Sequence, residues 1–403
     1  IIFLFTGFFR EIIFAKESIL FYSFAKESIL FFIFNSMDDK YKIDDNRASS
    51  LFKTKTFSGF KKNDVLKALF QSIEKGKLEN ACHWTTECII SGYLIELLDK
   101  FVSFASKIIH LNSPELPYYL LRKVKLFYNT LDLDLKKTAQ KENLIHYRNN
   151  QTIRNIFFDI VTVLTTTAKT KRYDKYPKIN ETTDFFFENI KLRLKAQANF
   201  IPDDMIQFTD PEELKIIMNE IMFQYKNLAS GYEVTSYWLS WVIQWEKVNR
   251  KKKIKWEIEE RKVTNVNPKY CKDVMWLVWQ TILNEANERD ENTKLQISSL
   301  YNLYKESYAP GKKTTRIPLL YHALGYLTHH VKFTIPIRKN QELFLQTQCN
   351  VNFMFSLKKT NEVKDAMNPI KKKDLPKKAN VQNEMTQDKF MVLTDIDTLV
   401  QSK

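Results

Sequence analysis

Glycine is nearly missing from this sequence, with 7 residues in a chain of 403. Tight hairpin turns and phosphate-cradling loops depend on glycine, because it adopts positive φ angles without steric cost. No two of the glycines lie within ten residues of each other, so the chain has neither a GxxxxGKS/T loop nor a GxGxxG fingerprint. The scarcity therefore disfavours many-stranded barrels and the common nucleotide-binding folds.

Apolar residues recur at helical spacing from about residue 63 to residue 330. The first expected helix has Asn63 as its N-cap and ends at Gly76, which is placed to form a left-handed cap. Residues 155–167 are β-branched and fit either a strand or a helix. Further helices are expected over residues 78–91, 93–110, 114–128, 183–198, 210–228, 233–261, 273–288, 293–307 and 317–330.

Short helices joined by short turns are typical of an antiparallel bundle or a helical array. We therefore predict a mainly α fold, a multi-helix array or bundle. Residues 331–357 alternate weakly and are expected to form a short extended arm or two short strands. The expected division is an N-terminal helical domain over residues 63–200 and a C-terminal helical domain with the arm over residues 201–357.

The N-terminal region differs from the helical part. Residues 1–36 contain the heptapeptide FAKESIL twice, ten residues apart, which would place the copies ~80° apart around a helix. We interpret this segment as an over-extended reading frame with translation starting at Met37, and then expect no membrane partner. A membrane anchor or signal is the alternative, although charged pairs interrupt its apolar runs. Residues 37–62 are polar and predicted to be a flexible lead-in.

The C-terminal region is a basic segment followed by an acidic, apolar one. Residues 358–380 contain eight lysines, three acids and two prolines, which predicts a disordered linker. Residues 381–403 are apolar and net acidic. They fit either a docking peptide for a protein partner or a terminal element that folds back on its own core.

The chemistry-bearing residues show no catalytic or metal-binding pattern. Cys82, His83 and Cys88 lie close together, but zinc sites place paired ligands two to four residues apart. We expect reduced thiols, packed in the core in the case of Cys82 and Cys88 beside Trp84. We predict no catalytic residues, no metal and no cofactor, and an enzyme whose site is assembled from distant residues is a minor alternative.

Tryptophans recur at helical spacing in two places. Trp238, Trp241 and Trp245 are three and four residues apart, and Trp276 and Trp279 are three apart. Such stripes usually form the core or a helix–helix contact. A stacking platform for nucleic-acid bases is the alternative.

Basic clusters are the strongest functional signal. The chain has 62 Lys and Arg against 47 Asp and Glu, a formal charge of +15. Binding to a polyanion requires many cations on one face, because each phosphate contact releases condensed counterions. The predicted nucleic-acid-binding residues are Lys247, Arg250, Lys251, Lys252, Lys253, Lys255, Lys312, Lys313 and Arg316. A lysine-rich surface that only keeps the protein soluble is the alternative.

Residues 64–116 carry the pattern ALxxSIxxGxxExAxxW, followed by SG, a helix and an LxxP turn. The stretch resembles an uncharacterised helical protein family of large nucleocytoplasmic DNA viruses, and residues 236–283 resemble a second block of that family. The resemblance covers about a quarter of the chain and implies no known activity. Residues 64–116 are also similar, more weakly, to the helical C-terminal region of clamp-loader-like AAA+ ATPases.

From the charge and this resemblance we expect a non-enzymatic basic protein of a large DNA virus. It would bind nucleic acid or genome-associated assemblies for replication, transcription or packaging, and would have viral protein partners. The expected location is the host cytoplasm, at the virus factory, or the nucleus, with the virion as a further location. The alternative is a virion structural protein, such as a minor capsid or core scaffold protein, acting through protein–protein contacts.

Overall fold

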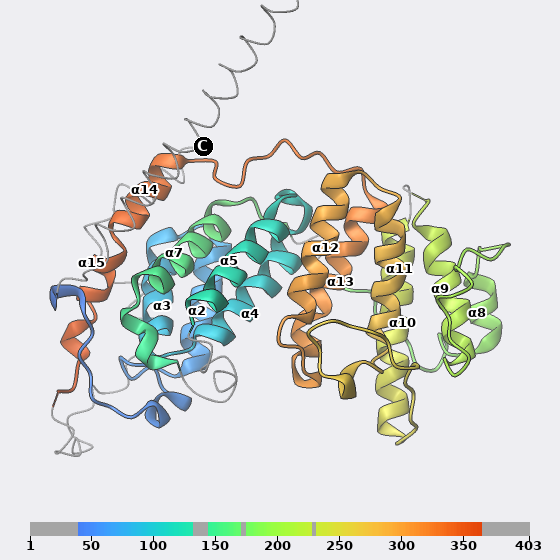
Figure 1. Ribbon diagram of the computed structural model, residues 1–403, viewed down its shortest axis with the longest axis horizontal. Helices are drawn as coiled ribbons and strands as arrows, with labels where there is room; N and C mark the ends of the chain where they lie inside the picture. Colours follow the sequence, from blue (N-terminus) through green and yellow to red (C-terminus); the bar gives the residue numbers. More distant parts are fainter. Residues whose placement is uncertain (1–38, 132–143, 171–174, 228–230, 365–403) are drawn as a thin grey trace, which may run out of the picture.

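The computed structural model describes residues 39–131, 144–170, 175–227 and 231–364. These residues form helices and no strand or sheet, so the predicted mainly α fold is confirmed. Figure 1 shows the helices side by side in one elongated array. Helices α14 (Gln341–Cys349) and α15 (Val351–Ser356) lie at one end, and α8 (Phe187–Arg193) lies at the other.

The first half of the array is built around α7, which contacts each of the other four helices. Its members are α2 (Lys62–Glu74), α3 (Leu78–Ile90), α4 (Leu94–Phe104), α5 (Leu116–Thr130) and α7 (Gln151–Thr166). Gly76 and Gly92 follow α2 and α3 with φ angles of 71° and 79°, which confirms the expected left-handed stop after the first helix. A π-helical turn, η3 (Ala105–Ile109), extends α4 toward the second half.

The second half is built around α13, which contacts α10, α11 and α12, and also α4 and η3 of the first half. Its members are α8 (Phe187–Arg193), α9 (Glu212–Gln224), α10 (Gly231–Lys251), α11 (Met275–Asn287), α12 (Glu291–Lys305) and α13 (Lys313–Thr328). Because α12 also packs on α5, the two halves share an extensive interface. The predicted division at residue 200 stays a prediction, and helices from both sides of it pack together.

Helices α3, α7 and α13 are buried on nearly all sides, which is why their sequences lack a clean polar face. Several buried threonines in these helices donate to a carbonyl oxygen one turn earlier, as Thr162 does to that of Phe158 at 2.7 Å. The β-branched stretch at residues 155–167 is helical for two reasons. The Asn150 side chain caps α7 by accepting from the Ile153 amide at 3.0 Å, and burial of the helix overrides its weak helical propensity.

The expected strands at residues 331–357 are wrong. Residues after α13 cross the array, and the chain then forms α14 (Gln341–Cys349) and α15 (Val351–Ser356), which pack on α7 and α3. Asn340 caps α14 by accepting from the Leu343 amide at 3.0 Å. The buried residues follow a helical spacing that dominates the weak alternation: Leu343, Phe344, Thr347, Val351, Met354 and Phe355.

Several helix boundaries also differ from the expectations. Helix α2 begins at Lys62, so Asn63 is not its N-cap, and Lys61 at that position makes no side-chain cap. Helix α8 starts at Phe187, because Asp184 takes part in a turn before the helix. Its carboxylate accepts from the Asn180 amide, and its carbonyl oxygen accepts from the Trp241 indole N–H. Helix α10 ends at Lys251, ten residues before the expected end.

Both predicted flexible segments are partly wrong. Residues 39–61 of the expected lead-in bury Ile43, Phe52 and Phe57 in the core, because apolar residues spaced irregularly along a loop are still removed from water. Residues 358–364 of the expected linker pack against this same region, and Lys358 is buried. The predictions for residues 1–36, 365–380 and 381–403 lie outside the described residues.

The tryptophan stripes belong to the core, as expected. Trp238, Trp241, Trp276 and Trp279 are at most 1% exposed, so none of these four rings has a free face for a base. Within the described part of the chain, no helix is both long enough and apolar enough to span a bilayer.

Two histidines pack against each other where α13 meets the first half of the array. The rings of His110 and His322 lie 4.4 Å apart, and neither ring nitrogen of His322 has a hydrogen-bond partner among the described residues. Burial lowers the pKa of His322 to about 3. Because the folded state holds this ring neutral, its contribution is complete above the unfolded-state pKa of ~6.5 and declines as pH falls toward 3.

We therefore expect acid lability from His322. The free energy of unfolding should fall by roughly 1.4 kcal/mol per pH unit on this account below pH ~6. Urea titrations between pH 7 and pH 5 measure it, and the H322F variant should show a flatter profile because Phe fills the site without titrating. Equal slopes for the parent protein and H322F would contradict this expectation.

Candidate nucleic-acid interface

Helix α10 ends in a run of cations that project from the body of the array, visible as the yellow helix in Figure 1. We call this run the α10 basic end. All six of its side chains are exposed: Lys247, Arg250, Lys251, Lys252, Lys253 and Lys255. The structure therefore brings six of the nine predicted nucleic-acid-binding residues together on one protrusion.

The backbone at the α10 basic end turns sharply at Lys253, which has a φ of 59°. The Ile254 amide donates to the carbonyl oxygen of Asn249 at 2.9 Å, and the Lys253 amide donates to that of Arg250 at 3.1 Å. These two bonds form the helix-terminating motif that usually contains glycine at the left-handed position. A lysine there carries a backbone strain of about 1 kcal/mol.

Tertiary contacts fix the segment that follows the turn. The Trp256 indole N–H donates to Glu213 Oε1 at 2.9 Å, and the Glu259 amide donates to Asp210 Oδ1 at 2.9 Å. Arg261 forms a buried ion pair with the same Asp210. The basic turn is therefore attached to α9 directly behind it, and this attachment also explains why α10 does not continue to residue 261.

The α10 basic end is only partly neutralised. Arg250 pairs with Glu246 at 2.8 Å and Lys255 pairs with Glu257 at 3.3 Å. The other four lysines make no ion pair with any described residue. Cations at a helix C-terminus are favoured by the helix dipole, so their positive charge at this position is stabilised.

The remaining three predicted residues are paired with carboxylates, and among them only Lys312 is half-buried rather than buried. Lys313 is buried and contacts Glu246 at 2.5 Å and Asp273 at 2.7 Å. Arg316 is buried, contacts Asp99 at 3.1 Å and donates to the carbonyl oxygen of Tyr304. Lys312 contacts the same Asp99 at 3.0 Å. The structure therefore places these cations in ion pairs within the array, and their carboxylate partners lie far away in the sequence.

A cleft of about 1190 Å³ opens beside Lys312, between the start of α13 and the first half of the array. Five lysines and two carboxylates line it together with aromatic and aliphatic side chains. We call it the basic cleft. Its lysines are Lys53, Lys62, Lys100, Lys107 and Lys312.

Sequence reasoning missed the basic cleft because its lysines come from five separate segments. Lys53 lies in the short helix η2 (Ser49–Lys53), Lys62 in α2, Lys100 in α4, Lys107 in η3 and Lys312 in η7 (Pro310–Lys312). No two of them are adjacent in the chain. The net charge of +15 was the one signal that pointed to further basic surface.

The thiols and histidines do not assemble a reactive centre in the described residues. Cys82, Cys88 and Cys271 are buried and form no disulfide within the described residues. Burial raises the pKa of both Cys88 and Cys271, which favours the unreactive protonated form. No group of three His, Cys, Asp or Glu residues in the described ranges has the geometry of a metal site.

No protein-family model, no curated protein and no solved structure matches this chain. The resemblance of residues 64–116 and 236–283 to a viral protein family therefore stays a prediction, as does the likeness to clamp-loader-like ATPases.

Proposed function

We propose that this protein binds nucleic acid through the α10 basic end without catalysing a reaction. The observation that carries the proposal is three adjacent exposed lysines at a protruding turn, Lys251, Lys252 and Lys253, with a fourth, Lys247, one helical turn earlier. None of the four is paired with a described carboxylate. Lysines in such an arrangement reach several phosphates along one strand, and the release of counterions supplies the affinity.

The turn itself supports the proposal. Glycine at position 253 would relieve the backbone strain, yet the chain has lysine there. A strained residue held by its surroundings is typical of functional positions. The interface contains charges and no exposed aromatic platform from the tryptophan stripes, so binding should depend on the phosphate backbone more than on base sequence.

The test is fluorescence anisotropy of the full chain with labelled duplex DNA, single-stranded DNA and single-stranded RNA over a range of salt concentrations. We expect affinity to fall steeply with salt and to vary little with sequence. The K251A/K252A/K253A variant removes three phosphate contacts, so it should bind about tenfold or more weakly at low salt. Its logarithmic salt slope on duplex DNA should be smaller by about 2.7.

The matched control is K67A/K75A/K77A, which removes three exposed lysines at α2 and changes net charge equally. It should bind like the parent protein. A further variant, K253G, should bind more weakly while its free energy of unfolding rises by up to about 1 kcal/mol. Equal loss in both triple variants, or no binding at low salt, would contradict the proposal.

A second candidate function, in protein scaffolding, rests on exposed apolar side chains near α8 and α9. Phe187 and Leu192 are 66% and 76% exposed, and Phe208 is fully exposed. Large exposed apolar side chains are typical of surfaces that bind other proteins. If the viral resemblance holds, the abundance of the protein in purified particles separates the two candidates, because a structural component would be present in many copies.

A further inference from the structure

We propose that residues 385–400 of this chain dock in the basic cleft. This inference concerns a different surface from the α10 basic end and does not depend on the proposed function. It rests on three features of the molecule: the charge and apolar character of the cleft, the point where the described chain ends, and the chemistry of the segment.

The basic cleft has an excess of positive charge that its own carboxylates do not cancel. Glu96 pairs with Lys62, and Asp99 pairs with Lys312 at 3.0 Å and with Arg316 at 3.1 Å. Lys100 lies 3.9 Å from the already paired Glu96. Lys53 and Lys107 make no ion pair with any described residue. Three lysines are therefore available to an anionic ligand.

The same cleft has apolar walls. Phe70, Phe104 and Ile108 line it and are only half-buried, and the Phe70 and Phe104 rings lie 5.4 Å apart. Covering these side chains would be favourable because apolar surface is removed from water. A ligand with carboxylates next to large apolar side chains therefore complements the cleft better than a chain of phosphates does.

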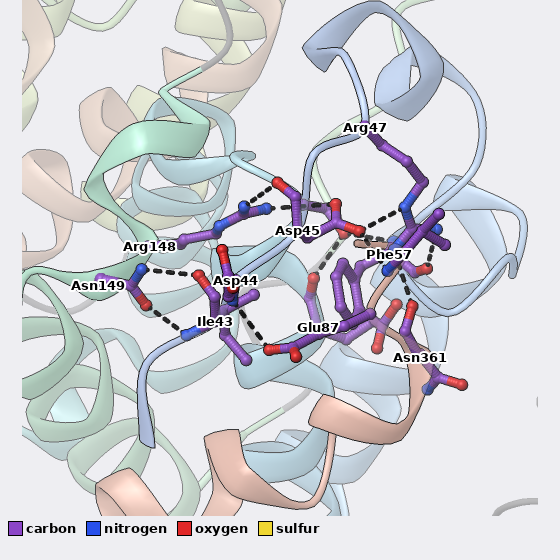
Figure 2. A network of polar contacts seen from close by, with 12 residues as sticks. Ile43, Asp44, Asp45, Arg47, Phe57, Glu87, Arg148, Asn149 and Asn361 are labelled. Atoms are coloured by element: carbon purple, nitrogen blue, oxygen red, sulfur yellow. Dashed lines mark hydrogen bonds and ion pairs between the residues drawn. The ribbon is translucent and has the colours of Figure 1, made fainter. Parts of the chain in front are cut away.

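The described chain ends against the loop that leads into η2, and η2 lines this cleft. Figure 2 shows how residues near the end are fastened to the loop before η2. Arg47 Nη2 donates to the carbonyl oxygen of Asn361 at 3.0 Å, and the Val363 amide donates to Asp45 Oδ1 at 2.9 Å. The Asn46 amide donates to the carbonyl oxygen of Val363 at 3.0 Å.

These hydrogen bonds hold the end of the described chain close to η2. Asn46 lies three residues before Ser49, and Ser49, Ser50, Phe52 and Lys53 all line the basic cleft. The last described residue, Lys364, is therefore bonded to Asn46, three residues before the short helix η2 that forms one wall of the cleft.

Residues 385–400 read MTQDKFMVLTDIDTLV. Their charged residues are Asp388, Asp395 and Asp397 against Lys389, and the remainder is rich in Phe, Met, Val, Leu and Ile. Asp395 and Asp397 lie within the apolar run, so carboxylates and apolar side chains would enter together. This is the composition that the lysines and half-buried rings of the cleft complement.

The connecting chain is long enough. The 20 residues from 365 to 384 can span at most about 70 Å when extended, and about 25 Å as a random coil. A tether of that length gives an effective concentration on the order of millimolar, so even a weak contact between the segment and the cleft would be occupied.

The test is zero-length carbodiimide crosslinking of the full chain at low micromolar concentration, followed by mass spectrometry. Carbodiimide joins a carboxylate directly to a lysine amine in contact with it. We expect crosslinks from Asp395 or Asp397 to Lys53, Lys100 or Lys107. The D395K/D397K variant and the K100E/K107E variant should each lose these crosslinks at least fivefold.

Charge exchange makes the test independent of folding defects. The variant that combines K100E/K107E with D395K/D397K restores complementarity with reversed sign, so crosslinks should reappear between the two exchanged sets. As a control, D365N/D374N removes two carboxylates of the connecting chain and should leave the crosslinks unchanged. Absence of crosslinks in the parent protein, or failure of the exchange, would overturn the proposal.

Two other occupants are separable in the same experiment. Mixing unlabelled and nitrogen-15-labelled chains reveals crosslinks between two copies, and a predominance of mixed-isotope pairs would replace the intramolecular proposal by an intermolecular one. If K100E/K107E instead weakens nucleic-acid binding and the parent shows no crosslink to residues 385–400, the cleft belongs to nucleic acid. Loss of binding in the α10 variants alone leaves this proposal intact.

Discussion

Replacing Lys358 with methionine is expected to lower the free energy of unfolding by about 3–5 kcal/mol, the usual cost of leaving one charge of a buried pair uncompensated. Lys358 is 4% exposed, and its Nζ lies 3.0 Å from Oε2 of Glu87 and 3.0 Å from Nε2 of His83. Glu87 is fully buried in α3. Without Lys358, its carboxylate would stay in a dry environment with no cation beside it.

The remaining contacts of Glu87 show why the pair is so tightly held. The Ser58 amide and hydroxyl both donate to the carboxylate at 2.7 Å. Burial alone raises the pKa of Glu87, but Lys358 and these donors outweigh it and lower the pKa to about 2. The pair also fastens the segment after α15 to α3, so losing Lys358 should release residues 358–364.

The destabilisation of K358M should depend on pH. In the parent protein, the low pKa of Glu87 contributes stability that is present above pH ~4.5 and is lost as pH falls toward 2. In K358M, burial without the cation should raise the pKa above its unfolded value, so protonation stabilises the fold as pH falls. The difference between the two proteins should therefore shrink from pH 7 to pH 4.

Urea denaturation at several pH values measures these effects. The E87Q/K358M double variant should be less destabilised than K358M at neutral pH, because it buries no unpaired charge. The K359M variant is the matched control, since Lys359 is only half-buried and donates to two backbone carbonyls, those of Asp39 and Lys42. If the free energy of unfolding falls by less than 1 kcal/mol in K358M, or falls equally in K358M and K359M, the Lys358–Glu87 pair does not stabilise the fold as predicted.

Gly325→Ala is expected to destabilise the protein by about 1–3 kcal/mol, although alanine normally strengthens a helix. Gly325 lies within α13, and a Cβ atom there would overlap with Cε1 of His110. The His110 ring is fully buried against His322 and Tyr232, so moving it away from a Cβ atom would disturb the packing of these rings. The close approach of α13 to the first half of the array therefore requires glycine.

Gly311→Ala provides the contrast. A Cβ atom at Gly311 meets nothing within 4 Å, and its φ is not in the left-handed region. Alanine there should be neutral or stabilise the protein by up to about 1 kcal/mol, because it restricts the unfolded chain. Urea denaturation measures the free energy of unfolding of both variants. Changes of the same sign and size would mean that His110 accommodates the added Cβ atom without destabilising the protein.

Sequence periodicity located most helices but not their ends. α2, α3, α9, α11 and α12 follow helical spacing with recognisable starts or stops, and each was expected within a few residues. α7 was ambiguous and α14 and α15 were expected as an extended arm. In α7, tertiary burial overrides the weak helical propensity of its β-branched residues. Helices α14 and α15 are so short that their helical spacing is hard to distinguish from an alternating pattern in the sequence.

The candidate interface could be predicted in part. The α10 basic end is contiguous in sequence, so its charge was visible at once. In the sequence, Lys313 and Arg316 could not be distinguished from the exposed cations of the α10 basic end. In the fold they are buried beside Glu246, Asp273 and Asp99. The basic cleft was invisible because its lysines are separated by up to 259 residues in the chain, from Lys53 to Lys312.

The sequence by itself determined the features that depend on near neighbours in the chain: helical periodicity, the exclusion of glycine-rich loops and the charge of the α10 basic end. Only the tertiary structure decided which cations are cancelled and which face solvent. The physical reason is that a Coulomb interaction depends on separation and burial in space. Lys313 and Glu246 are 67 residues apart in the chain, yet their charged atoms lie 2.5 Å apart in the fold.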